Sequence, residues 1–391
     1  MTTGTPQRHV EVPRLLPMRR PYGLLVGVAI SMGVVAFVAS QLLGHRLHDP
    51  DGFLGPVWVR LPVMVLAAFL VDIVPRSLWR SRASMRSWWP EVRAVVHEHW
   101  TRDRVALVCI GLTSFYVTYV SYRNLKNFLP DLYHHTDDAA LHRLDRWMMF
   151  GHEPATLLHT LFGETWAAHF FAFFYLLYLP LAPVTVVVWL VWSRNISYGY
   201  WYATANCLTW AMGTVSYYLV PSLGPAFYAP WLYRDLQVTG VTSLQDSLWN
   251  ARQDVRFNPF SDSIQSVAGF ASLHIALTLV IALVVQYQIQ NVLVRWLVWF
   301  YFSMTAISTL YFGWHYLADD IAGAVIAFAS VWLGAWATGN RVGRWGGRAL
   351  GRPRTTPDDD GVTVRRQASR TAGGATAAGT QPRNIGSEQS S

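Results

Sequence analysis

The sequence predicts an all-α, polytopic membrane protein with about eight transmembrane helices, a six-helix core and short interfacial helices on the outer face. Of its 391 residues, 52% are hydrophobic and only 14% are charged, whereas soluble domains carry about 25% charged residues. Apolar runs of about 20 residues, long enough to cross a bilayer, recur along the chain. A basic arm leads into a full-length apolar segment without a small-residue cleavage pattern, so we expect no cleavable signal peptide.

The apolar runs predict the helices in order. They lie at about 22–43, 56–75, 104–122, 166–192, 200–220, 273–290, 294–313 and 319–338. The second begins close to Arg60, whose long side chain must reach outward to the interface. The fourth contains Pro180 and Pro183, so we expect it to be kinked.

The basic residues predict the orientation of these helices. Most of the 31 Lys and Arg residues fall in the N-terminal arm, the loop after the second helix, two short turns and the tail. Because Lys and Arg collect on the cytoplasmic side, we expect a multi-pass protein of the plasma membrane with both termini cytoplasmic. Membrane topology also accounts for the net charge of +8, so no nucleic-acid partner is expected.

The segments between the helices suggest how the chain is organised. The outer connection 123–165 is polar and is expected to hold two short interfacial helices, and the connection 221–272 is long enough to act as a lid. We therefore divide the chain into four parts. These are a basic cytoplasmic arm (1–21), two N-terminal helices with a basic cytoplasmic loop (22–103), a catalytic membrane domain (104–340) and a disordered cytoplasmic tail (341–391).

Two histidines at outer helix ends are the main chemical signal. His315 is followed four residues later by Asp319, and on a helix these positions share a face, so the carboxylate can fix the imidazole tautomer. His274 begins another apolar run and could donate a proton to a leaving group. Ionisable groups near the membrane interior are costly and indicate function. The pattern suggests phosphoryl transfer, with Asp320 expected to cap the helix or be solvated.

Basic residues and a turn at the same outer face are candidates for phosphate binding. Arg123 and Lys126, the only Lys of the chain, end the third helix, and Arg can bind phosphate with two hydrogen bonds while Lys supplies a point charge. The turn that includes Ser222, Gly224 and Tyr228 could aim backbone N–H groups at a phosphate, or simply end the fifth helix. The two cysteines lie inside apolar runs, and phosphohistidine chemistry needs no metal, so we expect neither a metal nor a cofactor.

Three stretches resemble a known family. PSLGPAFY (221–228), GFASLHIA (269–276) and STLYFGWHYLADDIAG (308–323) are similar to motifs of the type 2 phosphatidic acid phosphatase (PAP2) superfamily. The similarity is greatest to the branch with the fungal inositol phosphorylceramide synthase catalytic subunit and bacterial inositolphosphotransferase relatives. The resemblance implies a PAP2-like six-helix core. It covers the second half of the membrane core and leaves out the first two helices and the tail.

The resemblance also implies roles for single residues. His315 would be the nucleophile that forms a phosphohistidine, Asp319 would orient it, and His274 would protonate the leaving group and later act as a base. Ser272 would offer a hydroxyl or an N–H to the phosphate. The family's Ser-Arg before the nucleophile is Ser308-Thr309 here, and its Lys-x6-Arg-Pro element is missing. Arg123 and Lys126 are therefore expected to replace the missing phosphate-binding Arg.

These features lead to one functional hypothesis and two alternatives. We expect a membrane phosphotransferase that moves a phospho-head group from a phospholipid or lipid-phosphate donor to a lipid or glycan hydroxyl on the extracytoplasmic side. The resemblance alone suggests phosphatidylinositol as the donor. With water as the acceptor, the same site would be a lipid phosphate or polyprenyl diphosphate phosphatase. A non-catalytic lipid-binding or transport protein with the same fold is the third hypothesis.

Overall fold

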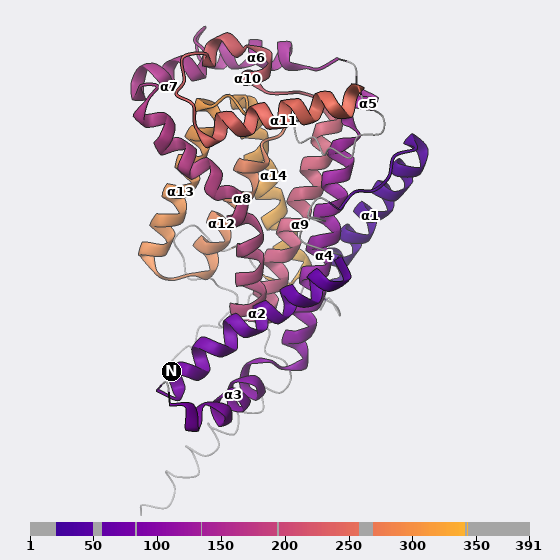
Figure 1. Cartoon of the computed structure of the whole chain (residues 1–391), viewed down its shortest axis with the longest axis vertical. Helices are drawn as coiled ribbons and strands as arrows, with labels where there is room; N and C mark the ends of the chain where they lie inside the picture. Colours follow the sequence, from indigo (N-terminus) through magenta and orange to yellow (C-terminus); the bar gives the residue numbers. More distant parts are fainter. Residues whose placement is uncertain are drawn as a thin grey trace, which may run out of the picture. The chain divides into compact units, whose positions relative to one another are not determined.

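The structure, a computed structural model, describes residues 21–49, 57–82, 84–133, 135–193, 195–257, 269–340 and 342, and the statements below concern these residues. They form helices joined by short connections (Figure 1). The helices are α1 (Gly23–Leu43), α2 (Val57–Arg80), α3 (Met85–His99), α4 (Arg102–Asn127), α5 (Leu129–Leu132), α6 (Asp138–Met148), α7 (Pro154–Phe162), α8 (Trp166–Trp192), α9 (Ile196–Leu219), α10 (Pro225–Tyr228), the 3₁₀ turn η2 (Pro230–Tyr233), α11 (Gly240–Phe257), α12 (Leu273–Gln288), α13 (Val292–Tyr311) and α14 (Leu317–Ala337).

All eight predicted apolar segments are helical, and the all-α polytopic fold is confirmed. Within the described residues, six helices are long and apolar enough to cross a membrane: α1, α2 from Pro62, α4 together with α5, α8, α13 and α14. The remaining two of the eight predicted transmembrane helices, α9 and α12, do not meet this criterion of length and apolar composition. The helix α12 is apolar but has only 16 residues, about 24 Å of helix, and α9 carries many polar residues.

The helix α9 forms the centre of the bundle, which explains its composition. It packs against α1, α4, α8, α12 and α14, and almost all its residues from Gly199 to Tyr217 are buried. A helix enclosed by other helices does not face lipid, so it need not be uniformly apolar. Two of its hydroxyls bond within the helix, since Thr209 and Thr214 each donate to the carbonyl four residues earlier at 2.8 Å.

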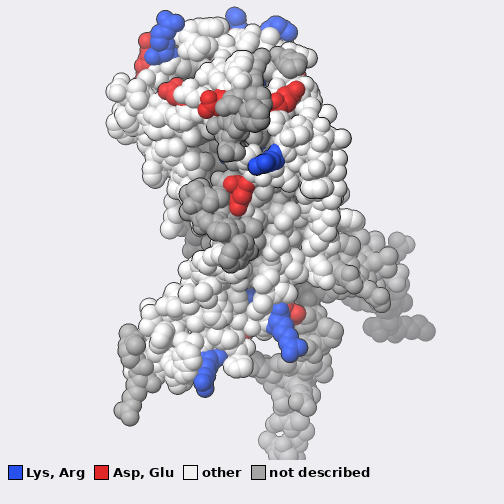
Figure 2. All heavy atoms as spheres, turned by 45° about the vertical axis from the view of Figure 1, so that its right-hand side comes forward, with Lys and Arg blue, Asp and Glu red and all other residues white. Residues whose placement is uncertain are grey.

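The first and last described spans end on the same side of the bundle. The ring of Tyr22, just before α1, lies 6.0 Å from that of Tyr200 near the start of α9. The hydroxyl of Ser197 donates to the carbonyl of Thr338, just after α14, at 3.0 Å. The opposite end carries the short helices α5, α6, α7, α10 and α11 (Figure 1). On the face drawn in Figure 2, charged side chains gather toward the two ends and leave a largely uncharged band between them.

The basic connection after α2 is more ordered than the predicted loop, because it contains α3. The buried carboxylate of Asp72 on α2 accepts from Arg76 Nε at 2.7 Å and from Trp100 Nε1 at 2.9 Å. Trp88 on α3 donates to Ser77 at 2.9 Å. These bonds fold α3 back on α2. The predicted arm (1–21) and tail (341–391) lie almost entirely outside the described residues, and the domain boundary at 103 remains a prediction.

Candidate active site

The two predicted histidines meet at the end of the bundle that carries the short helices. Nδ1 of His274, in the first turn of α12, lies 3.0 Å from Nε2 of His315, in the connection between α13 and α14. The helices α12 and α14 approach closely because Gly323 has no side chain, and a Cβ there would collide with the carbonyl of Ser272. The backbone N–H of Ser272 also donates to the carbonyl of Asp319 at 3.0 Å. The structure therefore brings together the two histidines that the sequence singled out.

A backbone carbonyl sets the tautomer of His315. Its Nδ1 lies 3.0 Å from the carbonyl oxygen of Gly269, and a carbonyl can only accept, so Nδ1 carries the proton. Burial lowers the pKa of His315 to about 4, which keeps the ring neutral near pH 7. The lone pair is then on Nε2, and Nδ1 of His274 is the donor in the pair. An imidazole with a lone pair on one nitrogen and a fixed proton on the other is suited to nucleophilic attack.

Asp319 reaches His315 in a way that differs from the expectation. The two were expected to share a helix face, but α14 begins only at Leu317, so His315 lies in the preceding turn. The Asp319 carboxylate still lies 3.5 Å from Nδ1 of His315, and it accepts from the N–H of Tyr316 at 2.9 Å. The Gly269 carbonyl is therefore the nearer partner of His315, and the Asp319 carboxyl group lies slightly farther from the same nitrogen.

Asp320 is buried, which contradicts the expectation that it caps the helix or is solvated. It accepts from the hydroxyl of Thr309 at 3.0 Å and from the hydroxyl of Ser272. Because that Ser272 oxygen also accepts from the N–H of Ile275 at 3.4 Å, it caps α12. The predicted phosphate ligand Ser272 thus uses its hydroxyl within the protein.

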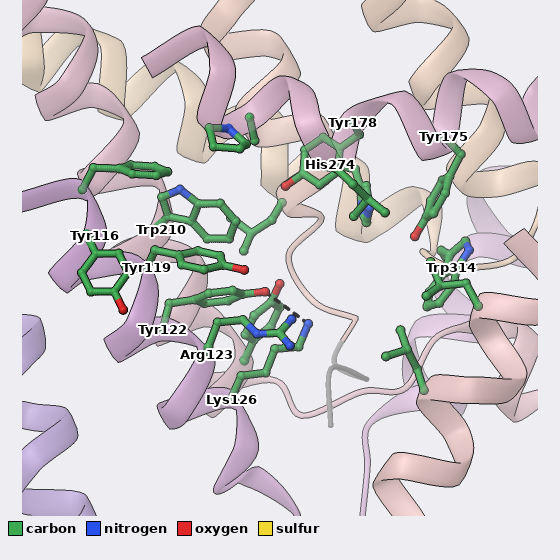
Figure 3. Close-up of a pocket in the computed structure, with 18 of the residues that line it drawn as sticks. Tyr116, Tyr119, Tyr122, Arg123, Lys126, Tyr175, Tyr178, Trp210, His274 and Trp314 are labelled. Carbon is green, nitrogen blue, oxygen red and sulfur yellow. Dashed lines mark hydrogen bonds between the residues drawn. The ribbon is translucent and has the colours of Figure 1, made fainter. Parts of the chain in front are cut away.

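A cavity of about 600 Å³ brings four of the predicted residues together. Figure 3 shows Arg123 and Lys126 of α4 on one side of it, and His274 on the other with Tyr175, Tyr178 and Trp314. His315 also lines it. The Nε of Arg123 is buried and finds no partner among the described residues. The ammonium of Lys126 donates to the Tyr122 hydroxyl at 3.3 Å and lies 4.9 Å from the ring centroid of Tyr217. Positive charge thus faces the histidine pair.

Three aromatic residues that the sequence reasoning missed hold His274. The ring centroids of Tyr175 and Tyr178, one turn apart on α8, lie 4.7 and 4.3 Å from that of His274. Trp314, which precedes His315 in the chain, stacks on Tyr175 with the ring centroids 5.4 Å apart. The spacing of the tyrosines was visible in the sequence, but aromatic residues at helical spacing more often form ordinary core.

The predicted Pro-Gly turn contributes Leu223 to the cavity lining, but not the predicted ligands Ser222, Gly224 and Tyr228. The N–H groups of Leu223 and Gly224 both donate to the carboxylate of Asp138 at 3.0 Å, so they do not point at the cavity. Gly224 has φ +101°, a conformation that favours glycine. Ser222 accepts from the N–H of Phe270 at 2.9 Å. Tyr228 is 38% exposed and is also absent from the cavity lining.

Two buried carboxylates of α6, missed from the sequence, hold this wall in place. Asp138 also accepts from the Tyr316 hydroxyl at 3.1 Å. Asp145, two turns later on the same face, accepts from the N–H groups of Leu317 and Ala318 at 2.8 and 3.2 Å, the free donors at the start of α14. Burial raises the pKa of Asp145 to about 6. We call Asp138 and Asp145 the α6 clamp.

The connection 221–272 covers the cavity through α11. Leu244 and Leu248 of this helix line the cavity. Gln245, between them, donates to the carbonyl of Phe312 at 2.8 Å. Residues 258–268 of the connection lie outside the described part of the chain. That the connection acts as a lid stays a prediction.

Comparison with known proteins supports the resemblance to one superfamily. Residues 139–333 match the family model described as PAP2 superfamily. The match includes His274, His315 and Asp319, and it begins inside α6, so α1 to α5 with Arg123 and Lys126 lie outside it. It does not confirm the inositol phosphorylceramide synthase branch. No curated protein and no solved structure matches the chain.

Proposed function

We propose, from the PAP2 superfamily match and the geometry of the cavity, that the protein is a membrane phosphotransferase. It moves a phospho-head group from a lipid donor to a lipid or glycan hydroxyl at the extracytoplasmic face, through a phosphohistidine on His315. The observation that carries this proposal is the histidine pair, 3.0 Å apart, opposite Arg123 and Lys126 in one cavity. This arrangement combines a neutral nucleophile, a proton donor and fixed positive charge.

The first half-reaction follows from the positions of the protons. A phosphate bound beside Arg123 displaces the hydrogen bond between the histidines, and Nε2 of His315 attacks phosphorus. As the N–P bond forms, the bond from phosphorus to the leaving oxygen breaks. For this step His274 carries a proton on both ring nitrogens, a form that the bound anionic phosphate favours; its Nδ1 proton goes to the leaving oxygen and the ring becomes neutral. The positive charge on the phosphorylated ring is stabilised through Nδ1–H by the Gly269 carbonyl and the Asp319 carboxylate.

The second half-reaction reverses these roles. Nδ1 of His274, now without its proton, takes the proton of an acceptor hydroxyl. The acceptor oxygen attacks phosphorus and the bond to His315 breaks, which restores both histidines. Such a double displacement gives ping-pong kinetics. Water as the acceptor would make the same site a phosphatase.

The surroundings of the histidines favour a hydroxyl acceptor over water. The cavity of about 600 Å³ is lined mainly by aromatic and aliphatic side chains, which disfavour bulk water and leave room for part of a second substrate. The departures from the phosphatase motif, Thr309 after Ser308 and Leu273 before His274, point in the same direction. Phosphatidylinositol as the donor still rests on the branch resemblance.

The test compares purified wild type with His315→Ala in lipid nanodiscs that contain a membrane-lipid extract. Mass spectrometry should find a wild-type product whose mass equals a lipid or glycan plus a phospho-head group. The variant should lose turnover by about 10⁴-fold or more, as expected for a missing nucleophile. His152→Ala, which replaces an exposed histidine of the outer connection, should keep the wild-type rate.

Other results would select the alternatives. Wild-type release of free phosphate, unaffected by added alcohols, would identify a phosphatase. Full turnover in His315→Ala would exclude the phosphohistidine route. If wild type formed neither a phosphoenzyme nor a vanadate complex, the non-catalytic lipid-binding or transport hypothesis would replace the enzyme.

A further inference from the structure

The catalytic cavity extends well beyond the histidines. On α4 its lining runs from Lys126 back to Leu112, and on α8 from Tyr175 on to Pro183. These positions repeat every three or four residues, so each helix contributes one face. On α2 the lining includes Met64. The part farthest from the charged groups is therefore bounded by α2, α4 and α8.

A second hollow of about 310 Å³ continues the first between α2 and α8. The two share Met64 and Pro183 in their linings. The second hollow is lined by Met64, Ala68, Val71, Pro183, Val184, Val187, Val188, Val191 and Trp192, and none of these carries a charge. We call it the tail groove.

The length of the combined hollows is informative about the ligand. From Tyr175 to Trp192 their lining follows α8, a distance of about 25 Å at 1.5 Å per residue. One leaflet of a bilayer contributes only about 15 Å of hydrocarbon, half of the core thickness. A chain that fills both hollows is therefore longer than one leaflet is thick.

The charges specify which end of the ligand lies where. Arg123 and Lys126 lie only at the histidine end, and the buried Nε of Arg123 finds no partner among the described residues. One cationic end and one long apolar end are complementary to an anionic amphiphile. Moreover, α2 lies outside residues 139–333, so the groove depends on a helix beyond the family match.

We propose that the tail groove binds one hydrocarbon chain of the lipid substrate, and that this chain is longer than a leaflet, as in a long polyprenyl phosphate. The inference rests on the proposed function for the position of the head group. It assigns a role to α2, which forms one wall of the groove through Met64, Ala68 and Val71. If the groove binds such a chain, the protein binds lipids with long chains more tightly than lipids with shorter chains.

The test measures binding of three probes to the full chain in nanodiscs: a long polyprenyl phosphate, phosphatidic acid and octyl phosphate. Ala68→Trp fills the groove, since Ala68 is only 3% exposed. It should weaken binding of the polyprenyl probe by about 10-fold, the effect of losing burial for a few methylene groups. Binding of phosphatidic acid and octyl phosphate should change less than about 2-fold relative to wild type. For each probe, the apparent Kd of the variant is divided by that of wild type. The probe's own partition into the lipid is the same in both measurements and drops out of this ratio.

Matched variants keep the result interpretable. Leu70→Trp adds the same side chain to a lipid-exposed position of α2, 45% exposed and outside the groove, and should bind all probes like wild type. Val187→Trp fills the groove from α8 and should reproduce Ala68→Trp. Unchanged octyl phosphate binding shows that a variant is folded. Equal losses for polyprenyl phosphate and phosphatidic acid, or no loss for either, would overturn the inference.

Repeating the binding in His315→Ala separates the two proposals. If this variant keeps the chain-length preference, the groove acts independently of the chemistry. Should turnover persist in His315→Ala while Ala68→Trp still loses the polyprenyl probe, the proposed function fails and the groove stands. Should turnover require His315 while Ala68→Trp binds every probe like wild type, the groove fails and the function stands.

Discussion

At the scale of single residues, one carbonyl oxygen fixes the tautomer of His315. Gly269 lies 46 residues before His315 in the chain, yet its oxygen lies 3.0 Å from Nδ1 of that histidine. The acceptor forces the proton onto Nδ1 and leaves the lone pair on Nε2. Asp319, the carboxyl group that the sequence suggested for this task, lies 3.5 Å from the same nitrogen.

The low pKa of His315 predicts an unusual pH profile. Burial lowers the pKa to about 4, against about 6.5 for a solvated imidazole. A nucleophile needs its lone pair, so activity should fall only as the pH drops through about 4, where the ring gains a proton. With a phosphodiester donor, the acid limb of kcat/KM in the free enzyme should lie there. An acid limb centred near pH 6.5 in wild type would contradict a buried, neutral His315.

At the scale of helices, the α6 clamp explains how a short surface helix shapes the site. Asp138 holds the turn at 223–224 and the hydroxyl of Tyr316. Asp145 holds the first N–H groups of α14. The two carboxylates lie on one buried face of α6, so a single rigid helix sets the positions of both segments that flank His315.

Asp138→Asn tests the clamp. The amide keeps only one acceptor oxygen, and its N–H₂ group faces the backbone N–H groups of Leu223 and Gly224 or the hydroxyl of Tyr316. At least one of these buried donors therefore loses its acceptor. We expect the free energy of unfolding to fall by about 2–4 kcal/mol and kcat to fall by about 10-fold as Tyr316 shifts. Denaturant titration in detergent and steady-state assays measure the two effects.

The neighbouring residue supplies the control for this experiment. Asp137 lies at the N-cap of α6, and its side chain makes no cap hydrogen bond. Asp137→Asn makes the same chemical change one position earlier, and it should leave stability and kcat close to wild type. If the two variants behaved alike, the buried carboxylate would have no special role.

At the scale of the whole molecule, the direction of the helices determines at which end of the bundle the two histidines lie. The start of α1 and the end of α14 lie together near the start of α9, while His274 and His315 lie at the other end with the short helices. The basic residues of the α2–α4 connection are at the first of these ends. By the positive-inside rule we expect the histidine end to face the extracytoplasmic side.

Cysteine labelling in intact cells tests this orientation. Gln237→Cys, exposed at the histidine end, should react with a membrane-impermeant maleimide. Ser84→Cys, exposed between α2 and α3, should react only after the cells are permeabilised. Wild type gives the background, because Cys109 lies within the span of α4 and Cys207 is buried. The reverse labelling pattern would place the site on the cytoplasmic side.

Much of the candidate site could be predicted because its signals are local. His274 and His315 interrupt apolar runs, and Arg123 and Lys126 end one, so each can be placed at a helix end without knowing the fold. Interruption of an apolar run by a charge is costly enough to be a clear signal. The tyrosines and the α6 clamp gave no comparable signal, because buried aromatic residues and surface-looking acids are common in many contexts.

The sequence by itself determined the all-α membrane fold and the positions of its helices, because bilayer thickness sets the length of an apolar run. Through its histidine motifs it also determined the superfamily match. Only the tertiary structure decided that Gly269 is the nearer partner of His315, that Asp138 and Asp145 hold the turns of the site, and that α2 extends the cavity. These contacts join segments far apart in the chain, and their geometry depends on how loops fold back onto helices, which no local pattern encodes.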